Sequence, residues 1–480
     1  MIRQSLVILL LGLTLFLLSS PDAWAKIKPQ SLFSDNAVLQ KGSRIPVWGT
    51  TDRSEKVVVR IGGAEASAMP SGGKWRVHLA IEPGGPFPLS ISQGDEKLEV
   101  KNVLIGEVWL CGGQSNMQWP VSLSTGAKEI IAQAGNPKLR LFTVERPKDG
   151  KGTDRPQTEV QGRWELCSPK SVAPFSAVAY AFGSEIQKKR AVPVGLISSN
   201  VGGTTAERWM SADALAADPQ LARMPKPQGS SDLYNLMIAP LVPYSIRGAI
   251  WYQGESNVDN AYAYRELMPA LIQNWRGLWQ REDFPFLIVQ LAPHTKPSAE
   301  LKDNVWAELR EAQLLTSQKM PNVHLAVITD LGDADIHPPK KAEVGQRLAR
   351  IALATTYGEK TEFSGPIYEK MNIRGPEIVL YFQHVGSGLE ARGGSLRGFA
   401  IAGADRKFHH AQAKIEGDTV VVSSSEVPQP VAVRYGWDTY PDVNLWNKDG
   451  LPASPFRTDA FRMKTQDPPP PKKKQQRTAT

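Results

Sequence analysis

The hydrophobic and polar positions change their period along the chain, and the first region reads as short strands. Apolar and polar residues alternate over residues 45–49, 56–61, 74–79 and 87–92. Glycine pairs at 62–63 and 72–73 separate some of these runs. Short strands spaced in this way are typical of two packed sheets. We therefore expect a small β-sandwich over residues 26–103.

From residue 104 the pattern changes to continuous apolar runs that alternate with helical stripes. Val178, Phe182 and Ile186 repeat at i, i+4 and i+8, and a second apolar stripe includes Val344 and Leu348. The apolar runs lie at residues 105–110, 194–198, 249–252, 286–291 and 323–328. Buried strands alternating with amphipathic helices predict a doubly wound parallel sheet with helices on both faces. We assign this α/β domain to residues 104–362.

Strand-like alternation returns near the end of the chain, for example at residues 377–382 and 418–423. This predicts a C-terminal β-rich domain over residues 363–465. The last residues, 466–480, consist mainly of proline, lysine and other polar residues. Such a segment has no apolar surface to bury, so we expect a disordered basic tail.

The first 25 residues have the pattern of a secretory signal peptide. Arg3 precedes an apolar run over residues 6–18, and Ala23-Trp24-Ala25 follows. This run is shorter than the ~20 residues that span a bilayer, which favours cleavage after Ala25 over a retained anchor. We expect a periplasmic or secreted protein without membrane insertion after signal cleavage.

Composition and charge narrow the classes of protein further. The 480 residues are 41% hydrophobic and 22% charged, as in globular proteins. Part of the net charge of +8 lies in the basic tail, and no basic stripe with interleaved aromatics occurs, which argues against nucleic-acid binding. Two cysteines, Cys111 and Cys167, exclude a disulfide framework, although their pairing stays open. The seven histidines form no metal-ligand motif.

Candidate chemistry gathers in the loops that follow the predicted central strands. Ligands of a doubly wound sheet bind outside the carboxyl ends of its strands. Four such loops carry polar or glycine-rich sequences: residues 112–117 (GGQSNM), 202–205 (GGTT), 253–257 (QGESN) and 330–339 (DLGDADIHPP). Together they supply a serine hydroxyl, amide donors, carboxylates and one imidazole.

These groups suit acyl transfer through a covalent intermediate. A serine hydroxyl needs a base within hydrogen-bond reach, and an acid must orient that base. Ser115 is the candidate nucleophile and His337 the candidate base, with Asp335 or Asp333 as the orienting acid. Taken singly, Ser115 could be a helix cap and the aspartates turn residues. Their convergence on one end of the predicted sheet favours a shared site.

The same loops offer groups for the oxyanion and for the substrate. The Ser115 and Gly203 amides, with the Gln253 or Asn257 side chain, can form the oxyanion hole. We expect the substrate to contact a further set of side chains, because polar groups suit hydroxyls and flat aromatic faces suit sugar rings. These are Gln114, Asn116, Glu255 and Trp251.

Four sequence blocks also carry a family resemblance. Residues 106–117 (GEVWLCGGQSNM), 202–209 (GGTTAERW), 248–257 (GAIWYQGESN) and 335–338 (DIHP) resemble the blocks of sialate O-acetylesterases, within the SGNH hydrolases. The similarity extends over nearly all of the mature chain, including residues 433–437 and 454–459.

The resemblance implies a flavodoxin-like catalytic domain with β-rich additions and removal of acetyl groups from sugar hydroxyls without a cofactor. It implies a Ser115 nucleophile with a His337 base, and an oxyanion hole that includes Gly203 and the amide of the third block. Many SGNH enzymes place the acid three residues before the histidine, where this chain has Ala334. Asp335 fits the block of this family, while Asp333 or a backbone carbonyl remains an alternative.

We therefore expect an exported serine esterase that deacetylates carbohydrates, of the sialate O-acetylesterase type. An esterase of acetylated xylan or of another polysaccharide is the alternative within the class. A catalytically silent carbohydrate-binding protein is the alternative from another class. The sequence does not predict the oligomeric state.

Overall fold

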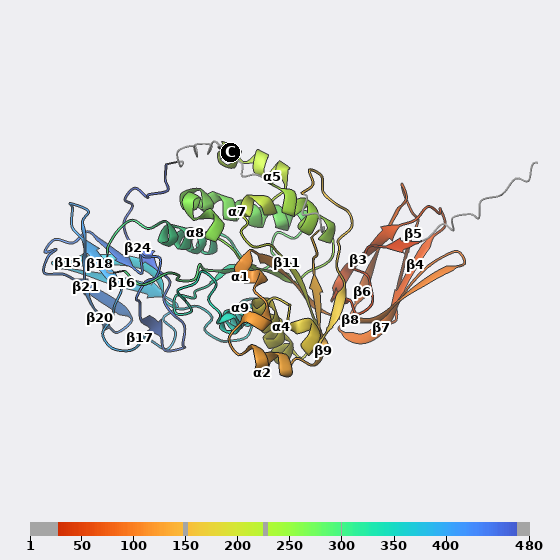
Figure 1. Ribbon diagram of the computed structural model, residues 1–480, viewed down its shortest axis with the longest axis horizontal. Coiled ribbons are helices and arrows are strands. Elements are labelled where there is room, and N and C mark those ends of the chain that lie inside the picture. The colour runs from red at the N-terminus through yellow and green to blue at the C-terminus, as the bar shows by residue number, and fades with distance from the viewer. Residues whose placement is uncertain (1–26, 147–151, 224–228, 299, 468–480) are drawn as a thin grey trace, which may run out of the picture.

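The computed structural model describes residues 27–146, 152–223, 229–298 and 300–467. The predicted signal peptide and nearly all of the predicted tail lie outside these residues. The described chain is elongated, with an α/β region in the middle and a β-rich region at each end (Figure 1). The N-terminal strands lie at the right of this view and the C-terminal strands at the left.

The N-terminal region contains the strands expected from its alternating sequence. Every second residue of β6 is buried, which is the signature of a strand with one face on a core. One antiparallel sheet has the order β1-β3-β6. In the second set of strands, β5 pairs with β4, β4 with β7, and β7 with the start of β8, while β2 pairs with β8 on its other side. The bounds are β1 Lys28–Pro29, β2 Val38–Gln40, β3 Gly42–Thr50, β4 Val57–Ile61, β5 Ala64–Ala68, β6 Lys74–Ile81, β7 Gly84–Gln93 and β8 Glu96–Gly113.

Strand β8 joins this region to the central one. Its first part pairs antiparallel with β7, and its last part pairs parallel with β11 and β12. The boundary expected at residues 103–104 therefore falls inside one continuous strand. Because β8 belongs to both regions, its carboxyl end is held by strands on two sides.

The central sheet has the order β10-β9-β11-β8-β12-β13-β14. All of these neighbours are parallel except β10, which is antiparallel to β9. The expectation of a purely parallel sheet was thus wrong at one edge, and the sheet is mixed. The bounds are β9 Asn136–Thr143, β10 Trp164–Cys167, β11 Val194–Asn200, β12 Gly248–Tyr252, β13 Phe286–Val289 and β14 Val323–Ala326.

Helices cover both faces of the central sheet, as the sequence predicted. Successive residues of a strand point to opposite faces, so Val108 joins one core with helices α7 and α8, while Trp109 joins the other with α4 and α9. Figure 1 shows α7 and α8 above the sheet and α4 and α9 below it. The bounds are α4 Ala177–Arg190, α7 Ala261–Leu278, α8 Val305–Lys319 and α9 Lys341–Thr355.

Shorter helices follow the strand ends and connect the larger elements. They are α1 Ser115–Gln118, η1 Val121–Leu123, α2 Ala127–Ala132, α3 Pro169–Val172, η2 Ala206–Trp209, α5 Ala212–Ala217, α6 Pro219–Arg223, η3 Tyr234–Ile238, η4 Ala239–Leu241 and η5 Glu255–Asn260.

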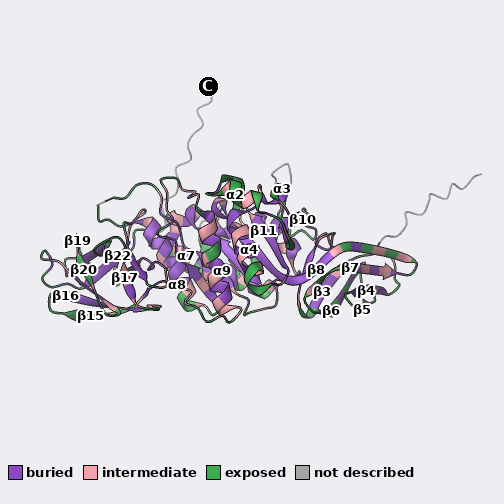
Figure 2. Cartoon of the chain, turned by 90° about the horizontal axis from the view of Figure 1, so that it is seen from below, coloured by how far each residue is buried: buried purple, intermediate pink, exposed green. Residues whose placement is uncertain are grey.

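The C-terminal region is a separate β-unit with its own core (Figure 2). Its sheets have the orders β15-β16-β21-β20, β19-β18-β22-β24 and β17-β23. The bounds are β15 Ile367–Arg374, β16 Glu377–Gln383, β17 Leu389–Ala391, β18 Phe399–Ala402, β19 Phe408–His410, β20 Gln412–Glu416, β21 Thr419–Ser423, β22 Ala432–Tyr435, β23 Leu445–Asn447 and β24 Phe456–Arg457.

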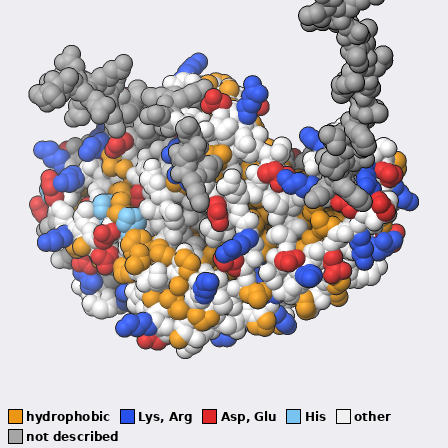
Figure 3. Space-filling view, turned by 45° about the vertical axis from the view of Figure 1, so that its right-hand side comes forward, with side chains coloured by type: hydrophobic (Ala, Val, Ile, Leu, Met, Phe, Trp, Pro, Cys, Tyr) orange, Lys and Arg blue, Asp and Glu red, His pale blue; other side chains and the backbone are white. Residues whose placement is uncertain are grey.

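Three features bear on the chemistry that the sequence left open. Cys111 and Cys167 are both buried free thiols. Within the described residues, no group of three or more His, Cys, Asp or Glu side chains could hold a metal ion, and no helix is long and apolar enough to cross a membrane. On the face drawn in Figure 3, basic and acidic side chains are interspersed.

Candidate active site

The turn after β8 places Ser115 at the first residue of helix α1. Gly113 ends the strand with φ +143°, and a Cβ at this position would lie 2.2 Å from the carbonyl oxygen of Tyr252 on β12. Only glycine allows this approach. The chain can then turn sharply at the carboxyl end of the sheet, with the Ser115 side chain partly exposed.

The loop after β14 brings His337 to Ser115. His337 Nε2 lies 2.9 Å from Ser115 Oγ, although 222 positions separate the two residues. The imidazole ring also stacks on the indole of Trp119, with ring centroids 5.1 Å apart and planes at 16°. The hydroxyl and the imidazole are thus within proton-transfer distance, as acyl transfer by a serine requires.

Of the two candidate acids, Asp335 contacts the imidazole. Asp335 Oδ1 lies 3.1 Å from His337 Nδ1 and accepts a hydrogen bond of 2.7 Å from the His337 backbone N–H. That backbone N–H is the main cause that holds the pKa of Asp335 below its ordinary value. Asp333 instead accepts a hydrogen bond from the Asp335 backbone N–H, so it supports the turn one step away.

The glycine loop after β11 lies against the serine. A Cβ on Gly202 would come within 3.2 Å of the Ser115 Cβ, and Gly203 adopts φ +69° on the exposed side of the loop. Among the described residues, neither the Ser115 N–H nor the Gly203 N–H donates a hydrogen bond to a protein group. Both amides are therefore available as donors to a ligand.

Gln253 and Asn257 have their polar groups engaged in the protein. Gln253 Nε2 donates to Thr204 O at 3.1 Å and to Asn257 Oδ1 at 2.7 Å, so both of its amide hydrogens are used. Asn257 Nδ2 donates to Glu207 Oε2 at 3.1 Å, and its oxygen accepts from the Ala206 N–H. The expectation of an oxyanion donor from Gln253 does not fit this arrangement, because the side chain links two loops instead. Asn257 keeps one amide hydrogen.

The side chains expected to contact the substrate are buried. Trp251 is 0% exposed and packs edge-on against Trp209 and Trp275, because β12 is covered on both faces. Gln114, Asn116 and Glu255 are 3%, 1% and 9% exposed. The expectation of direct sugar contacts from these four residues does not fit their positions, since they present little or no surface.

A lysine that the sequence analysis missed lies beneath the site. Lys341, the first residue of α9, is 1% exposed, and its Nζ donates to Asn116 Oδ1. Its ammonium also lies 5.4 Å from the ring centroid of Tyr252 and 5.8 Å from that of Trp119. Burial lowers the pKa of Lys341 to about 7 and raises that of Glu255. Nothing in the local sequence distinguishes Lys341 from its neighbour Lys340, which is exposed.

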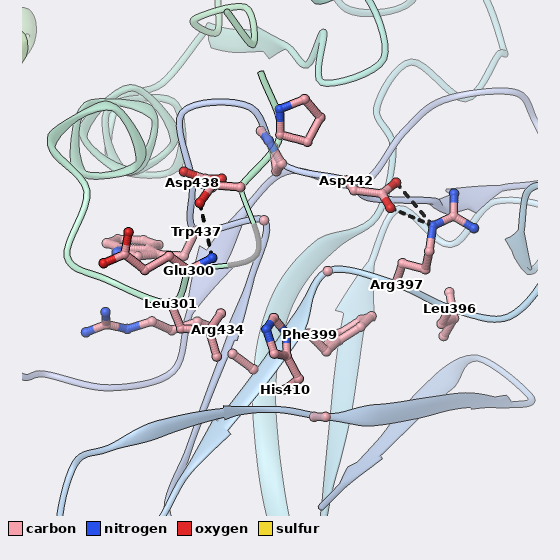
Figure 4. A pocket seen from close by; sticks show the side chains of 17 residues that line it. Glu300, Leu301, Leu396, Arg397, Phe399, His410, Arg434, Trp437, Asp438 and Asp442 are labelled. Carbon is pink, nitrogen blue, oxygen red and sulfur yellow. Dashed lines mark hydrogen bonds and ion pairs between the residues drawn. The ribbon is translucent and has the colours of Figure 1, made fainter. Parts of the chain in front are cut away.

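A pocket of about 470 Å³ lies between the C-terminal β-unit and residues 297, 298, 300 and 301 (Figure 4). Arg397 and Asp442 pair across part of its wall, with Phe399 and Trp437 nearby. Its lining includes none of the predicted site residues. It is therefore separate from the Ser115–His337 contact.

Comparisons with known proteins agree with one another. Residues 105–354 match the family described as carbohydrate esterase, sialic acid-specific acetylesterase. The chain is 32% identical over 507 residues to the sialate O-acetylesterases of Homo sapiens and Pongo abelii, covering 93% of this chain and 96% of each relative. Among solved structures, a carbohydrate acetylesterase from Xanthomonas citri is 40% identical, with a TM-score of 0.85 over 91% of this chain and all of that one.

Proposed function

Since the chain belongs to the family of sialic acid-specific acetylesterases and is an enzyme that hydrolyses O-acetyl esters of carbohydrates, we propose that Ser115, His337 and Asp335 are its catalytic triad. The distance of 2.9 Å between Ser115 Oγ and His337 Nε2 carries this proposal. A hydroxyl in this position can pass its proton to the imidazole while the oxygen attacks a carbonyl carbon.

In the first half of the reaction, Ser115 Oγ attacks the acetyl carbonyl and His337 Nε2 takes the serine proton. Asp335 accepts a hydrogen bond from the Nδ1–H of the imidazole, which sets the tautomer and stabilises the imidazolium. The N–H groups of Ser115 and Gly203 donate to the oxyanion of the tetrahedral intermediate, where one such donor is typically worth about 3–4 kcal/mol. The C–O bond to the sugar then breaks, and His337 gives its proton to the leaving alcohol.

In the second half, water replaces the sugar. His337 removes a proton from this water, whose oxygen attacks the acetyl carbon on Ser115 through a second tetrahedral intermediate. The bond between the acetyl group and Ser115 breaks, the serine regains a proton from His337, and acetate leaves. The same groups act in reverse order, so no cofactor is needed for the balance of atoms and protons.

The substrate class follows from the relatives rather than from the site. We place O-acetylated sialic acid first, because the similarity to sialate O-acetylesterases covers 93% of the chain. Another acetylated glycan is the second candidate, because the Xanthomonas citri relative is described only as a carbohydrate acetylesterase and is more similar in sequence. Turnover of acetylated sialic acid and of acetylated xylo-oligosaccharides, compared by kcat/KM, separates the two. A higher value on the xylo-oligosaccharides contradicts the sialate assignment.

The triad is tested by replacing its nucleophile. Ser115→Ala removes the hydroxyl, so hydrolysis of acetyl esters and labelling by a fluorophosphonate are expected to disappear. Ser122→Ala, in the exposed residues of η1 nearby, is the matched control and keeps both. Wild-type activity in Ser115→Ala would refute the proposed mechanism.

The architecture and location of the enzyme extend the proposal. We assign residues 104–362 to a flavodoxin-like SGNH hydrolase domain, flanked by β-sandwich-like regions at residues 26–103 and 363–465. Five consecutive parallel neighbours, from β9 to β14, and the strand-end position of Ser115 support this assignment. Export rests on the signal-like pattern of residues 1–25, and N-terminal sequencing of the mature protein tests it, with Lys26 as the expected first residue.

A further inference from the structure

The side chain of Asn116 links the two loops that carry Ser115 and His337. Its Nδ2 donates to the carbonyl oxygen of Ile336 at 3.0 Å, so the bond joins the neighbour of Ser115 to the neighbour of His337. No other side-chain hydrogen bond between these two loops is present in the described part of the chain, apart from the Ser115–His337 contact itself. The position of the imidazole relative to the serine therefore depends on this amide together with the stacking of His337 on Trp119.

Two buried charged groups hold the Asn116 amide from opposite sides. Lys341 Nζ donates to its oxygen, and Glu255 Oε1 accepts from its Nδ2 at 2.5 Å. Asn116 is 1% exposed, so water does not compete for these bonds. An amide that donates twice and accepts once from fixed partners has one orientation only.

The charges of Lys341 and Glu255 compensate each other in a buried position, where either charge alone would be unfavourable. An unpaired buried ammonium or carboxylate costs several kcal/mol, so each needs the other or a polar partner. Attraction to the Glu255 carboxylate opposes the loss of the Lys341 charge on burial. Apolar side chains at these two positions would avoid the free-energy cost of burying charges. The presence of the charged pair therefore indicates a role in the adjacent site.

We propose that Asn116 is a positioning residue that sets the Ser115–His337 distance, and that Lys341 and Glu255 are the buried pair that fixes its orientation. This inference rests on the proposed function of Ser115 and His337. It replaces the expectation that Asn116 and Glu255 contact the substrate.

The role predicts a loss in kcat rather than in substrate binding. Asn116→Ala releases the Ile336 carbonyl, and a displacement of about 1 Å between reacting groups costs about 10²-fold in rate. We expect kcat to fall by about that factor with KM changed less than about twofold, since the buried side chain does not touch the sugar. A side chain that bound substrate would instead raise KM.

The two groups that hold Asn116 predict the same kind of loss. Glu255→Gln and Lys341→Met each weaken or remove one of the bonds that fix the Asn116 amide. We expect each variant to lower kcat in the same direction as Asn116→Ala and less severely, with little change in KM, because neither buried side chain touches the sugar.

A matched variant controls for the loss of a buried carboxylate. Glu107 lies within β8, away from Ser115, and is 1% exposed. It forms ion pairs with Lys41 and Arg247. Glu107→Gln is expected to lower the thermal midpoint and to leave kcat and KM unchanged. A purely structural role of the Asn116 group would make its three variants behave in this way too.

The experiment measures kcat and KM on one acetyl ester, with circular dichroism to confirm folding. If the wild type neither turns over nor reacts with a fluorophosphonate, the proposed function fails, whatever the variants do. If the wild type is active and folded Asn116→Ala keeps its kcat, this inference fails alone. If Asn116→Ala does not fold, Glu255→Gln and Lys341→Met decide: a lower kcat with little change in KM supports the inference, and an unchanged kcat overturns it.

Discussion

Replacing Asp335 tests how the imidazole is oriented. Asp335→Ala removes the acceptor of both the Nδ1 contact of 3.1 Å and the backbone bond of 2.7 Å from His337. Without the acid, the imidazole loses its fixed tautomer, and in enzymes with a buried triad acid this costs about 10⁴-fold in kcat. The Asp335 side chain is 68% exposed, so water screens part of its charge and also replaces it as an acceptor. We therefore expect a smaller loss, of about 10²-fold.

The matched variant is Asp333→Ala, which removes only the hydrogen bond to the Asp335 backbone N–H. Its expected loss in kcat is less than about tenfold, because the geometry of Asp335 and His337 is otherwise kept. Initial rates on an acetyl ester at saturating substrate, over the pH range in which both variants stay folded, measure the two effects. A collapse of the rate in Asp333→Ala with near wild-type activity in Asp335→Ala would refute this assignment of the acid.

Two further outcomes follow from buried groups. Burial holds the pKa of Lys341 at about 7 against an ordinary value of 10.5, so between these values the unfolded chain binds a proton that the folded chain does not. The free energy of unfolding of the wild type, relative to that of Lys341→Met, is expected to rise with pH across this window and to decrease as pH falls towards 7. Urea titrations of both proteins at about pH 7.5 and about pH 9.5 measure this difference. A difference that does not change between the two pH values would contradict the expectation. Cys111 and Cys167 are buried free thiols, so a thiol reagent should label neither in the native enzyme and both in urea. Rapid native labelling would contradict the burial of these strands.

The positions of five central strands along the chain were predictable because their apolar runs are continuous. Parallel strands covered on both faces have few polar positions, so β8, β11, β12, β13 and β14 are visible in the sequence. Strands β9 and β10 were not predicted. β9 begins with Asn136, Pro137 and Lys138, and β10 has only four residues, so neither has a long apolar run.

The reacting groups could be predicted because they follow strand ends, where the fold itself gathers them. The roles of the supporting groups could not be. Glu255, Asn116 and Gln253 stand in polar loop sequences, which usually face water, yet the packing of η5 against the turn after β8 buries them. Lys341 lies next to an exposed lysine, and only the contact with Asn116 distinguishes the two.

The most direct test of the mechanism is to trap the covalent intermediate. The enzyme is mixed with an acetyl ester, quenched in acid during turnover and digested, and the peptides are analysed by mass spectrometry. The account predicts an acetyl group on the peptide that contains Ser115, and no acetylated peptide from Ser115→Ala. An acetyl group on a different residue, or continued turnover by Ser115→Ala, would contradict it.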